Sequence, residues 1–220
     1  MGIVGPAFVD LSERIDIESM RPLRDYVLLK TFTRERSAGG VLLPEGSPCN
    51  ECSVGEVLKV GSGIENPYAL DNFPFDLKPG DVALTMEYMG EKLGLRQGNY
   101  RLVRSHGVWA TLKLKDRESF EIEEIAPRMA TVVVRPDLEV KTKTGIYLPN
   151  EQDSKSPNRW ATVTAVGPGM MHAKSRQRIP MEVEVGQRVL MMRYAGADIV
   201  VKGEKLRICD QTDIRFGTEG

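Results

Sequence analysis

The sequence lacks an excess of charge of either sign. Its 220 residues carry 30 lysines and arginines against 31 acidic residues, a formal net charge of −1. No global field therefore draws the chain to nucleic acid or to an anionic membrane. Aromatic residues are also few, at 6%, which disfavours a surface of stacked aromatics for single-stranded nucleic acid. The hydrophobic content of 41% indicates a globular protein instead.

Long apolar runs are also missing. No stretch approaches the roughly 18 apolar residues that a membrane span needs, so we expect no membrane partner. Residues 1–19 carry four acidic residues against one arginine, which is wrong for an organelle transit peptide, and they lack the apolar core of a secretion signal. We expect a cytoplasmic protein.

Cysteine is scarce, and its odd count of three fits a reducing compartment without structural disulfides. Cys49 and Cys52 form a C-x-x-C, which is typical of a redox pair or of half a zinc site. The second half of the chain offers no matching motif, only Cys209 on a predicted strand. We therefore favour cysteines without a metal and expect no cofactor.

Residues for catalysis are equally sparse. The two histidines, His106 and His172, have no serine, cysteine or acid neighbour that suggests a catalytic set, and we expect both at the surface. The sequence contains no G-x-x-x-x-G-K-S/T phosphate loop. We expect Trp109 and Trp160 to serve packing. The sequence thus predicts a protein that is not an enzyme.

What the sequence does contain is an internal repeat. A repeat is sought before local structure because it indicates the architecture of the whole chain. A shift of 105 residues superposes the start of the two copies, and one extra residue near 150–158 changes the shift to 106. The matched segments are YVLLK (26–30) with TVVVR (131–135), VLLP (41–44) with IYLP (146–149), and GEVLKVGSG (55–63) with the run that ends at Gly169. We expect an N-terminal extension over 1–19, a first domain over 20–118 and a second over 119–220.

Each copy reads as β-structure. Its apolar and β-branched segments are short, are punctuated by glycine or proline, and show no sustained helical period. A Val-Gly-x-Gly step in both copies predicts a strand that ends in a turn with positive φ, and Gly80 and Gly186 suit the same role. The sequence predicts two small β-barrels in tandem.

Four segments carry a resemblance to a known family. MRPLRDYVLLK, SAGGVLLPEG, GEVLKVGSG and KPGDVALTMEYMG, in this order and spacing, resemble a GroES-type co-chaperonin, a ten-kilodalton chaperonin. The resemblance covers residues 20 to about 112 and, more weakly at its start, 126–217. The tandem form resembles the chloroplast co-chaperonins, and bacteriophages also encode divergent members. It implies an all-β protein of two GroES-like barrels, each with a mobile loop and a roof hairpin.

The resemblance also implies a site. Family members cap a chaperonin ring, and an apolar tripeptide in each mobile loop docks into the chaperonin's apical domain. By position, the chaperonin-binding residues are Val41, Leu42, Leu43, Ile146, Tyr147 and Leu148, and the loop glycines are Gly39, Gly40 and Gly145. Copy two has one glycine where copy one has two, and its tyrosine is bulkier than an aliphatic residue, so its loop is expected to bind more weakly or to bind a different groove.

The energetics of such a loop favour joint action. Burying three apolar side chains gains roughly 5 to 8 kcal/mol, whereas ordering about ten residues costs roughly 1 to 2 kcal/mol each. One loop alone binds weakly, and several loops on one body bind together. We therefore expect a ring-like oligomer that caps a group I chaperonin, with the nucleotide bound and hydrolysed by that partner.

The predicted roof hairpins differ in charge. Residues 64–76 contain Glu65, Asp71 and Asp76 without a basic residue, and residues 170–182 contain Lys174, Arg176 and Arg178. One hypothesis is that unlike roofs meet around the ring opening and favour alternation of the two copies. Two solvated loops are the alternative.

Other functions remain open at this point. The chain could be a structural or virion component whose loops are vestigial, or a small-barrel nucleic-acid module that uses HAKSRQR as its basic patch. The expected location follows the origin of the chain: the host cytoplasm for a viral protein, or the plastid stroma for a mature plastid form.

Overall fold

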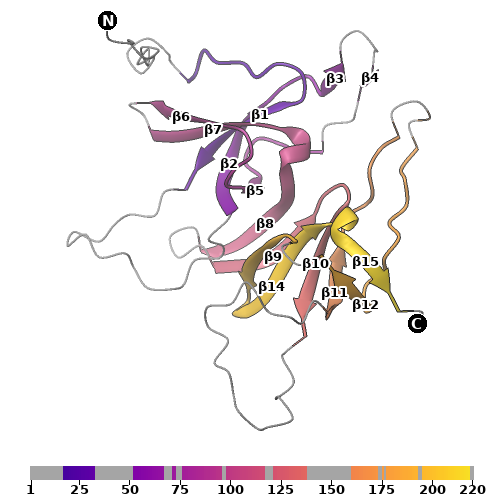
Figure 1. Cartoon of the computed structure of the whole chain (residues 1–220). Helices are drawn as coiled ribbons and strands as arrows, with labels where there is room; N and C mark the ends of the chain where they lie inside the picture. Colours follow the sequence, from indigo (N-terminus) through magenta and orange to yellow (C-terminus); the bar gives the residue numbers. More distant parts are fainter. Residues whose placement is uncertain are drawn as a thin grey trace, which may run out of the picture.

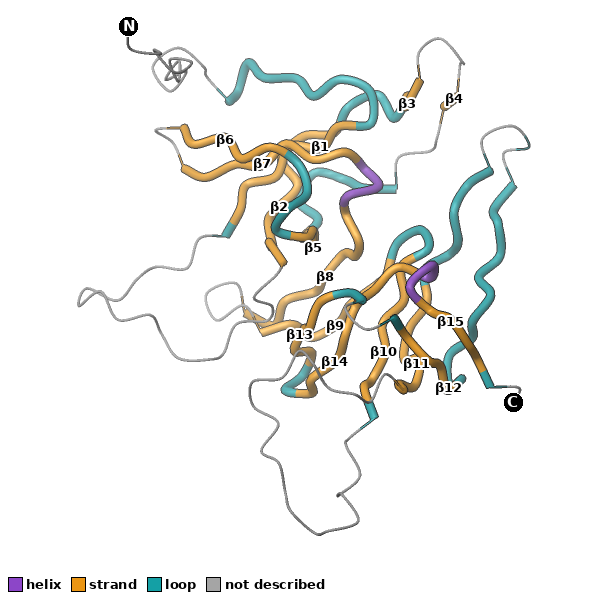
Figure 2. Tube along the Cα trace, in the orientation of Figure 1, coloured by secondary structure: helices purple, strands orange, loops and turns teal. Residues whose placement is uncertain are grey.

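The computed structural model describes residues 17–32, 52–66, 71–72, 76–95, 98–116, 121–137, 160–172, 175, 177–192 and 195–218. The prediction of an all-β protein is confirmed, and strands dominate the chain in Figure 2. The first half contains β1 (Tyr26–Thr31), β2 (Cys52–Val60), β3 (Ile64–Asn66), β4 (Asp71–Asn72), β5 (Val82–Met86), β6 (Glu91–Leu95), β7 (Gly98–Arg104) and β8 (Val108–Asp116). The second half contains β9 (Glu121–Pro127), β10 (Thr131–Pro136), β11 (Trp160–Val166), β12 (Arg188–Met191), β13 (Ala197–Val201), β14 (Glu204–Asp210) and β15 (Ile214–Gly217).

The two halves repeat one another in three dimensions. β1 lies between β2 and β7, and β10 lies between β11 and β14, in antiparallel pairs throughout. The β1–β2 and β10–β11 pairs have a β-bulge at the same place, because β2 and β11 each carry one extra residue, Leu58 opposite Leu28–Leu29 and Thr164 opposite Val133–Val134. Such an extra residue increases the local twist and helps a small sheet to curl. The expected tandem barrels are therefore present.

Both expected hairpins between the Gly-x-Gly step and the next strand occur in part. In the first domain β3 pairs antiparallel with β4, and in the second Met171 bridges Arg178. Arg178 also donates a hydrogen bond of 3.1 Å to the carbonyl oxygen of Gly169. The charge hypothesis for these hairpins is not tested at Lys174 and Arg176, which lie outside the described residues.

The Gly-x-Gly step ends its strand in the same way in both copies. The predicted positive φ falls on the second glycine, at 79° for Gly63 and 87° for Gly169. The first glycine is needed for a different reason. A Cβ atom on Gly61 would lie 2.2 Å from the carbonyl oxygen of Arg24, and one on Gly167 would lie 2.2 Å from that of Met129. Only a residue without a side chain allows this approach of two backbones.

Replacing Gly167 with alanine should therefore lower the free energy of unfolding by about 1–3 kcal/mol, the usual cost of overpacking. Gly61→Ala should cost about the same in the other domain. The matched control is Gly107→Ala, because a Cβ there meets no atom closer than 3.7 Å, on Met89. Urea unfolding followed by circular dichroism measures all three, and equal stabilities for Gly167→Ala and Gly107→Ala would contradict the close approach.

The two domains share one sheet and one buried apolar cluster, in addition to a cluster within each barrel. β8 leaves the first barrel and pairs antiparallel with β9 (Figure 1). β9 in turn runs parallel to β13, so that 13 strands form a single order. The buried residues between them, called the joint core here, come from both domains: Val82, Leu84, Met86, Ala110 and Leu112 from the first, and Ile122, Val133, Ala197, Ile199, Val201, Leu206 and Ile208 from the second. A shared apolar core of this size joins the barrels into one unit.

Candidate functional site

The residues expected to bind a chaperonin lie outside the described residues. They are Val41, Leu42, Leu43, Ile146, Tyr147 and Leu148, together with Gly39, Gly40 and Gly145. The structure does describe the residues from which the two segments, 33–51 and 138–159, leave the barrels and return. The site can therefore be described from its two bases.

The base of the first segment is apolar. The Phe32 amide donates a hydrogen bond of 2.9 Å to the carbonyl oxygen of Val54 and closes the segment. Phe32, Cys52 and Val54 all pack partly against the joint core. Cys52 pairs with Met86 on β5, a strand that continues into that core. The first segment is thus anchored at the contact between the two domains.

The base of the second segment is closed by the equivalent backbone hydrogen bond. Unlike the apolar first base, it is held by an ion pair. The Asp137 amide donates to the carbonyl oxygen of Trp160 at 3.0 Å. The Arg188 guanidinium then pairs with the Asp137 carboxylate at 2.7 Å and lies 5.0 Å from the Trp160 ring centre. This cation–π contact adds to the ion pair, so Trp160 serves to hold the base of the segment. Because the closing residues differ by 105 on one side and 106 on the other, the predicted extra residue lies in this second segment.

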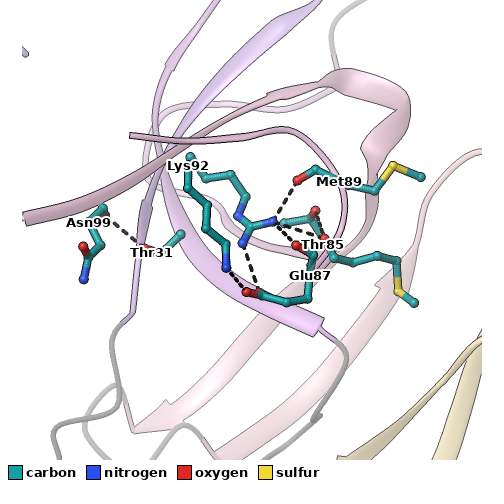
Figure 3. Close-up of polar contacts among 8 residues, drawn as sticks. Thr31, Thr85, Glu87, Met89, Lys92 and Asn99 are labelled. Atoms are coloured by element: carbon teal, nitrogen blue, oxygen red, sulfur yellow. Dashed lines mark hydrogen bonds and ion pairs between the residues drawn. The ribbon is translucent and has the colours of Figure 1, made fainter. Parts of the chain in front are cut away.

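A buried arginine fixes the turn beside the first base. Arg101 of β7 is 2% exposed, and its Nη1 donates to the carbonyl oxygens of Glu87 and Met89, each at 2.8 Å. Its Nη2 donates to the Glu87 carboxylate at 3.0 Å, and Lys92 pairs with the same carboxylate (Figure 3). Charge-assisted bonds of this kind are stronger than neutral ones, so the 86–90 turn is held firmly.

A second buried arginine lies at the joint between the domains. Arg128, 4% exposed, follows β9, and its Nη1 donates to the carbonyl oxygens of Ser105 and Val108, each at 2.8 Å. Its Nε donates to the Asp76 carboxylate at 3.2 Å, and its Nη2 pairs with the same group. One side chain of the second domain thus satisfies several acceptors of the first. Asp76, expected to be a roof charge, is a partner of this joint.

The cysteines differ from expectation. Cys52 is disulfide-bonded, which corrects the prediction of a chain without structural disulfides. A sulfur held in a disulfide is not available as a zinc ligand, so Cys52 cannot contribute to half a zinc site in this state. Cys49 lies outside the described residues. Cys209 is free and fully buried on β14, as its predicted strand position requires.

Burial, together with the nearby carboxylates of Asp213 and Asp210, raises the pKa of the Cys209 thiol to about 12. The thiol ionises near 9.0 when it is not buried, so folding favours its neutral form. The stability that it contributes is complete below pH 9 and is lost as the pH rises towards 12. Between pH 8 and 10.5 the loss should be about 2 kcal/mol.

The test compares wild type with Cys209→Ala by urea unfolding across this pH range. The variant should be less stable at pH 8, because a small cavity replaces the sulfur, and its free energy of unfolding should fall less steeply with pH. Parallel curves for the two proteins would contradict the inference that the buried thiol stays neutral.

Both histidines have polar neighbours, which corrects the expectation that they have no serine or acid neighbour: the Ser175 Oγ lies 3.1 Å from the His172 Nδ1, and the Asp25 carboxylate lies 4.0 Å from the His106 Nδ1. His106 and His172 are exposed, as expected, and Trp109 packs partly against the joint core. The described part of the chain contains no group of three or more His, Cys, Asp or Glu residues placed to hold a metal ion. A cavity of about 350 Å³ beside His106 is lined by Arg104, whose Nε is bound to the Asp25 carboxylate at 2.9 Å. None of the described helices has the length and apolarity to cross a membrane.

The fold and the two loop bases define a class of protein, a tandem pair of small β-barrels that each close a long segment on a shared rigid body. Comparison with known families agrees. The family described as the chaperonin 10 Kd subunit matches the chain twice, over residues 19–112 and 124–216. The chain belongs to this family, and the resemblance stated from its motifs is confirmed.

Individual relatives match either most of the chain or less than half of it. The chain is 29% identical over 182 residues to the 20 kDa chloroplastic chaperonin of Spinacia oleracea, an alignment that covers 82% of this chain and 67% of the relative. It is 40% identical over 92 residues to a co-chaperonin GroES of Rhodothermus marinus and 34% identical over 93 residues to that of Gemmatimonas aurantiaca. These cover 41% and 42% of this chain, and 88% and 92% of the relatives. The relatives are co-chaperonins of chloroplasts and bacteria, which supports a co-chaperonin function.

Proposed function

We propose that the chain caps the ring of a group I chaperonin when nucleotide is bound, by docking the apolar tips of its two loop segments into grooves of the apical domains. The observation that carries this proposal is the shared support of the two segments. Each segment is closed by the same backbone hydrogen bond, on barrels that share one sheet and the joint core. Such a body holds the bases of the two segments together.

Two loops carried by one body can bind together where a single loop would bind too weakly. Burying Val41, Leu42 and Leu43 gains roughly 5 to 8 kcal/mol, which is no more than the cost of ordering about ten residues. Once the first tip is bound, the second binds at a high effective concentration, and no new contact is required. Each single contact stays weak, so the cap can be released when the chaperonin moves its grooves.

The two bases suggest that the tips are not equivalent. The first base rests on the joint core through Phe32 and Cys52, and the second is held by the contacts of Arg188 with Asp137 and Trp160. Together with the bulkier Tyr147 and the single Gly145, these differences favour a weaker or altered contact for the second tip. Within this proposal the chain binds the chaperonin ring and catalyses no reaction, and the chaperonin hydrolyses the nucleotide.

The experiment measures binding of the chain to a purified group I chaperonin, with and without nucleotide, and co-sedimentation is the readout. The proposal expects binding that needs nucleotide. A parallel titration with a single-stranded oligonucleotide tests the rival nucleic-acid function, for which salt-sensitive binding is expected. Binding to neither would support a structural role and would overturn the proposal.

A further inference from the structure

The C-x-x-C formed by Cys49 and Cys52 has no role in the proposed function. Cys52 is the first residue of β2, and it is therefore the point at which the first segment, 33–51, returns to its barrel. The second segment, 138–159, contains no cysteine. Any chemistry of this pair therefore acts on the first tip and not on the second.

The partner of Cys52 follows by elimination. The chain contains three cysteines, of which Cys52 is disulfide-bonded and Cys209 is free. Cys49, which lies outside the described residues, is the cysteine that is left in the chain. Two intervening residues are the spacing of redox-active dithiols. In the cytoplasm, where we expect this chain, disulfides are usually transient and redox-sensing. Both the spacing and the compartment favour a reversible bond.

Cys52 lies at a firmly held point of the first barrel. It is opposite Met86, the last residue of β5, and packs partly against the joint core. Met86 is buried, and its carbonyl oxygen accepts a hydrogen bond of 3.3 Å from Nη1 of the buried Arg101. A disulfide at Cys52 therefore ties the returning chain to a rigid part of the fold.

The outgoing end of the first segment is fixed as well. The Thr31 hydroxyl donates a hydrogen bond of 3.0 Å to the carbonyl oxygen of Asn99 (Figure 3). With both ends anchored, the entropy that docking of the first tip costs comes from ordering the residues between them. A disulfide across residues 49–52 constrains the last of these residues before docking. Less entropy is then lost on docking, so the oxidised chain should bind more tightly.

The third cysteine does not take part in thiol exchange. Cys209 is fully buried in the second barrel, and its pKa of about 12 keeps the thiol neutral near pH 7. Exchange requires a thiolate that can reach the disulfide. The redox chemistry of the native chain is therefore confined to the pair at the first segment.

We propose that Cys49 and Cys52 form a thiol–disulfide exchange site that sets the affinity of the first tip for the chaperonin, high when oxidised and low when reduced. The inference rests on the proposed function, because it concerns regulation of the same tip.

The reductant of this exchange is a dithiol. One of its thiolates attacks a sulfur of the pair, forms a mixed disulfide and releases the first cysteine. Its second thiolate then attacks the mixed disulfide and releases the second cysteine. The pair gains two electrons and two protons, and the dithiol loses them and becomes a disulfide. Oxidation of the pair by a disulfide is the reverse of these steps.

The first measurement follows the pair without chaperonin. The full chain is equilibrated with mixtures of reduced and oxidised dithiothreitol and is then alkylated in its native form. The reduced chain should gain two alkyl groups and the oxidised chain none, reversibly, because Cys209 is buried. After trypsin, peptide 37–59, which contains both cysteines of the pair, should be lighter by two hydrogen atoms when oxidised. A pair that forms no bond, or that stays oxidised until the chain unfolds, would overturn the inference.

Cleavage by a glutamate-specific protease tests the constraint on the returning chain. Glu51 lies between the two cysteines in the sequence, and Glu151 in the second segment is the matched control. A protease binds its substrate in an extended form, which the small disulfide ring prevents. Reduction should raise the cleavage rate at Glu51 at least about tenfold and leave the rate at Glu151 unchanged. Equal rates at Glu51 in the two redox states would show that the disulfide imposes no such constraint.

The closing measurement compares the nucleotide-dependent affinity of a purified group I chaperonin for the oxidised and the reduced chain. Reduction should weaken binding at least about tenfold, because more residues must be ordered when the first tip docks. Cys49→Ser combined with Cys52→Ser should bind like the reduced chain in both buffers, which controls for an effect of the reductant on the chaperonin. Leu42→Asp, which disables the first tip, should bind equally with and without reductant.

These outcomes separate the inference from the proposed function. Equal binding in the two redox states, or tighter binding after reduction, would overturn the inference and leave capping intact. Absence of binding in both states would reject capping. The alkylation and cleavage results do not depend on the chaperonin, and they would still show whether the pair is a reversible site.

Discussion

Arg128→Met is expected to lower the free energy of unfolding by about 2–5 kcal/mol. The substitution removes the Arg128 donor to the carbonyl oxygen of Val108 and one of two donors to that of Ser105, which also accepts from the Val108 amide; both lost bonds are 2.8 Å long. Each buried acceptor left without a partner costs about 1–3 kcal/mol. Asp76 adds less, because its side chain is 41% exposed and can be hydrated once the ion pair is lost.

The loss should also weaken the coupling between the domains. The donors of Arg128 join its own domain to acceptors of the other, so their removal affects the joint more than either barrel. In a calorimetric scan, the variant should unfold over a broader range or in two steps, whereas wild type should unfold in one.

The control is Arg135→Met. Arg135 pairs with Glu204, but the two side chains are 55% and 49% exposed, and such surface pairs contribute about 0–1 kcal/mol. Urea unfolding should therefore separate the two variants clearly. An Arg128→Met protein as stable as Arg135→Met would show that the joint does not depend on this guanidinium.

The repeat and the strands could be predicted from the sequence because both are local. Segments such as YVLLK (26–30) carry the β-branched and apolar residues of a buried strand, and the structure places β1 there. The glycines also predict the positions of turns, and Gly80 and Gly186 have positive φ as predicted. The need for glycine at Gly61 was not predictable in the same way, because it depends on a backbone distant in the sequence.

The joint between the domains could not be read from local patterns. The charged stretch 113–128 looks like a junction, yet it contains the end of β8 and all of β9, which pair with each other. Its alternating charges lie on the exposed face, where Lys115 and Glu121 pair at 3.1 Å, while Ile122 is buried. In the sequence Arg128 cannot be distinguished from the other charged residues of this stretch, and only the fold shows it to be buried.

The candidate site was likewise predictable only in part from the sequence. The motifs VLLP (41–44) and IYLP (146–149) could be identified from the sequence, and the roles of their residues remain predictions. The bases of the two segments could not, because Phe32 meets Val54 and Arg188 meets Asp137 only through strand pairing. The disulfide at Cys52 was not expected either, since an odd cysteine count favoured free thiols.

The second large effect is expected at the loop tips, and it tests the central claim that they bind a chaperonin. Leu42→Asp combined with Tyr147→Asp places a charge in each apolar tip, and a charge taken into an apolar groove without a partner loses its hydration. The double variant should bind at least about a hundredfold more weakly, because both contacts of a two-point attachment are lost. Its unfolding curve should match wild type, as should that of the control Val185→Asp, which places the same charge on an exposed turn of the second domain.

The most direct measurement is therefore the nucleotide-dependent affinity of a purified group I chaperonin for wild type, the double variant and the Val185→Asp control under one set of conditions. The account predicts tight nucleotide-dependent binding of wild type and the control, and loss of that binding in the double variant. Equal affinities for wild type and the double variant would contradict the loop mechanism.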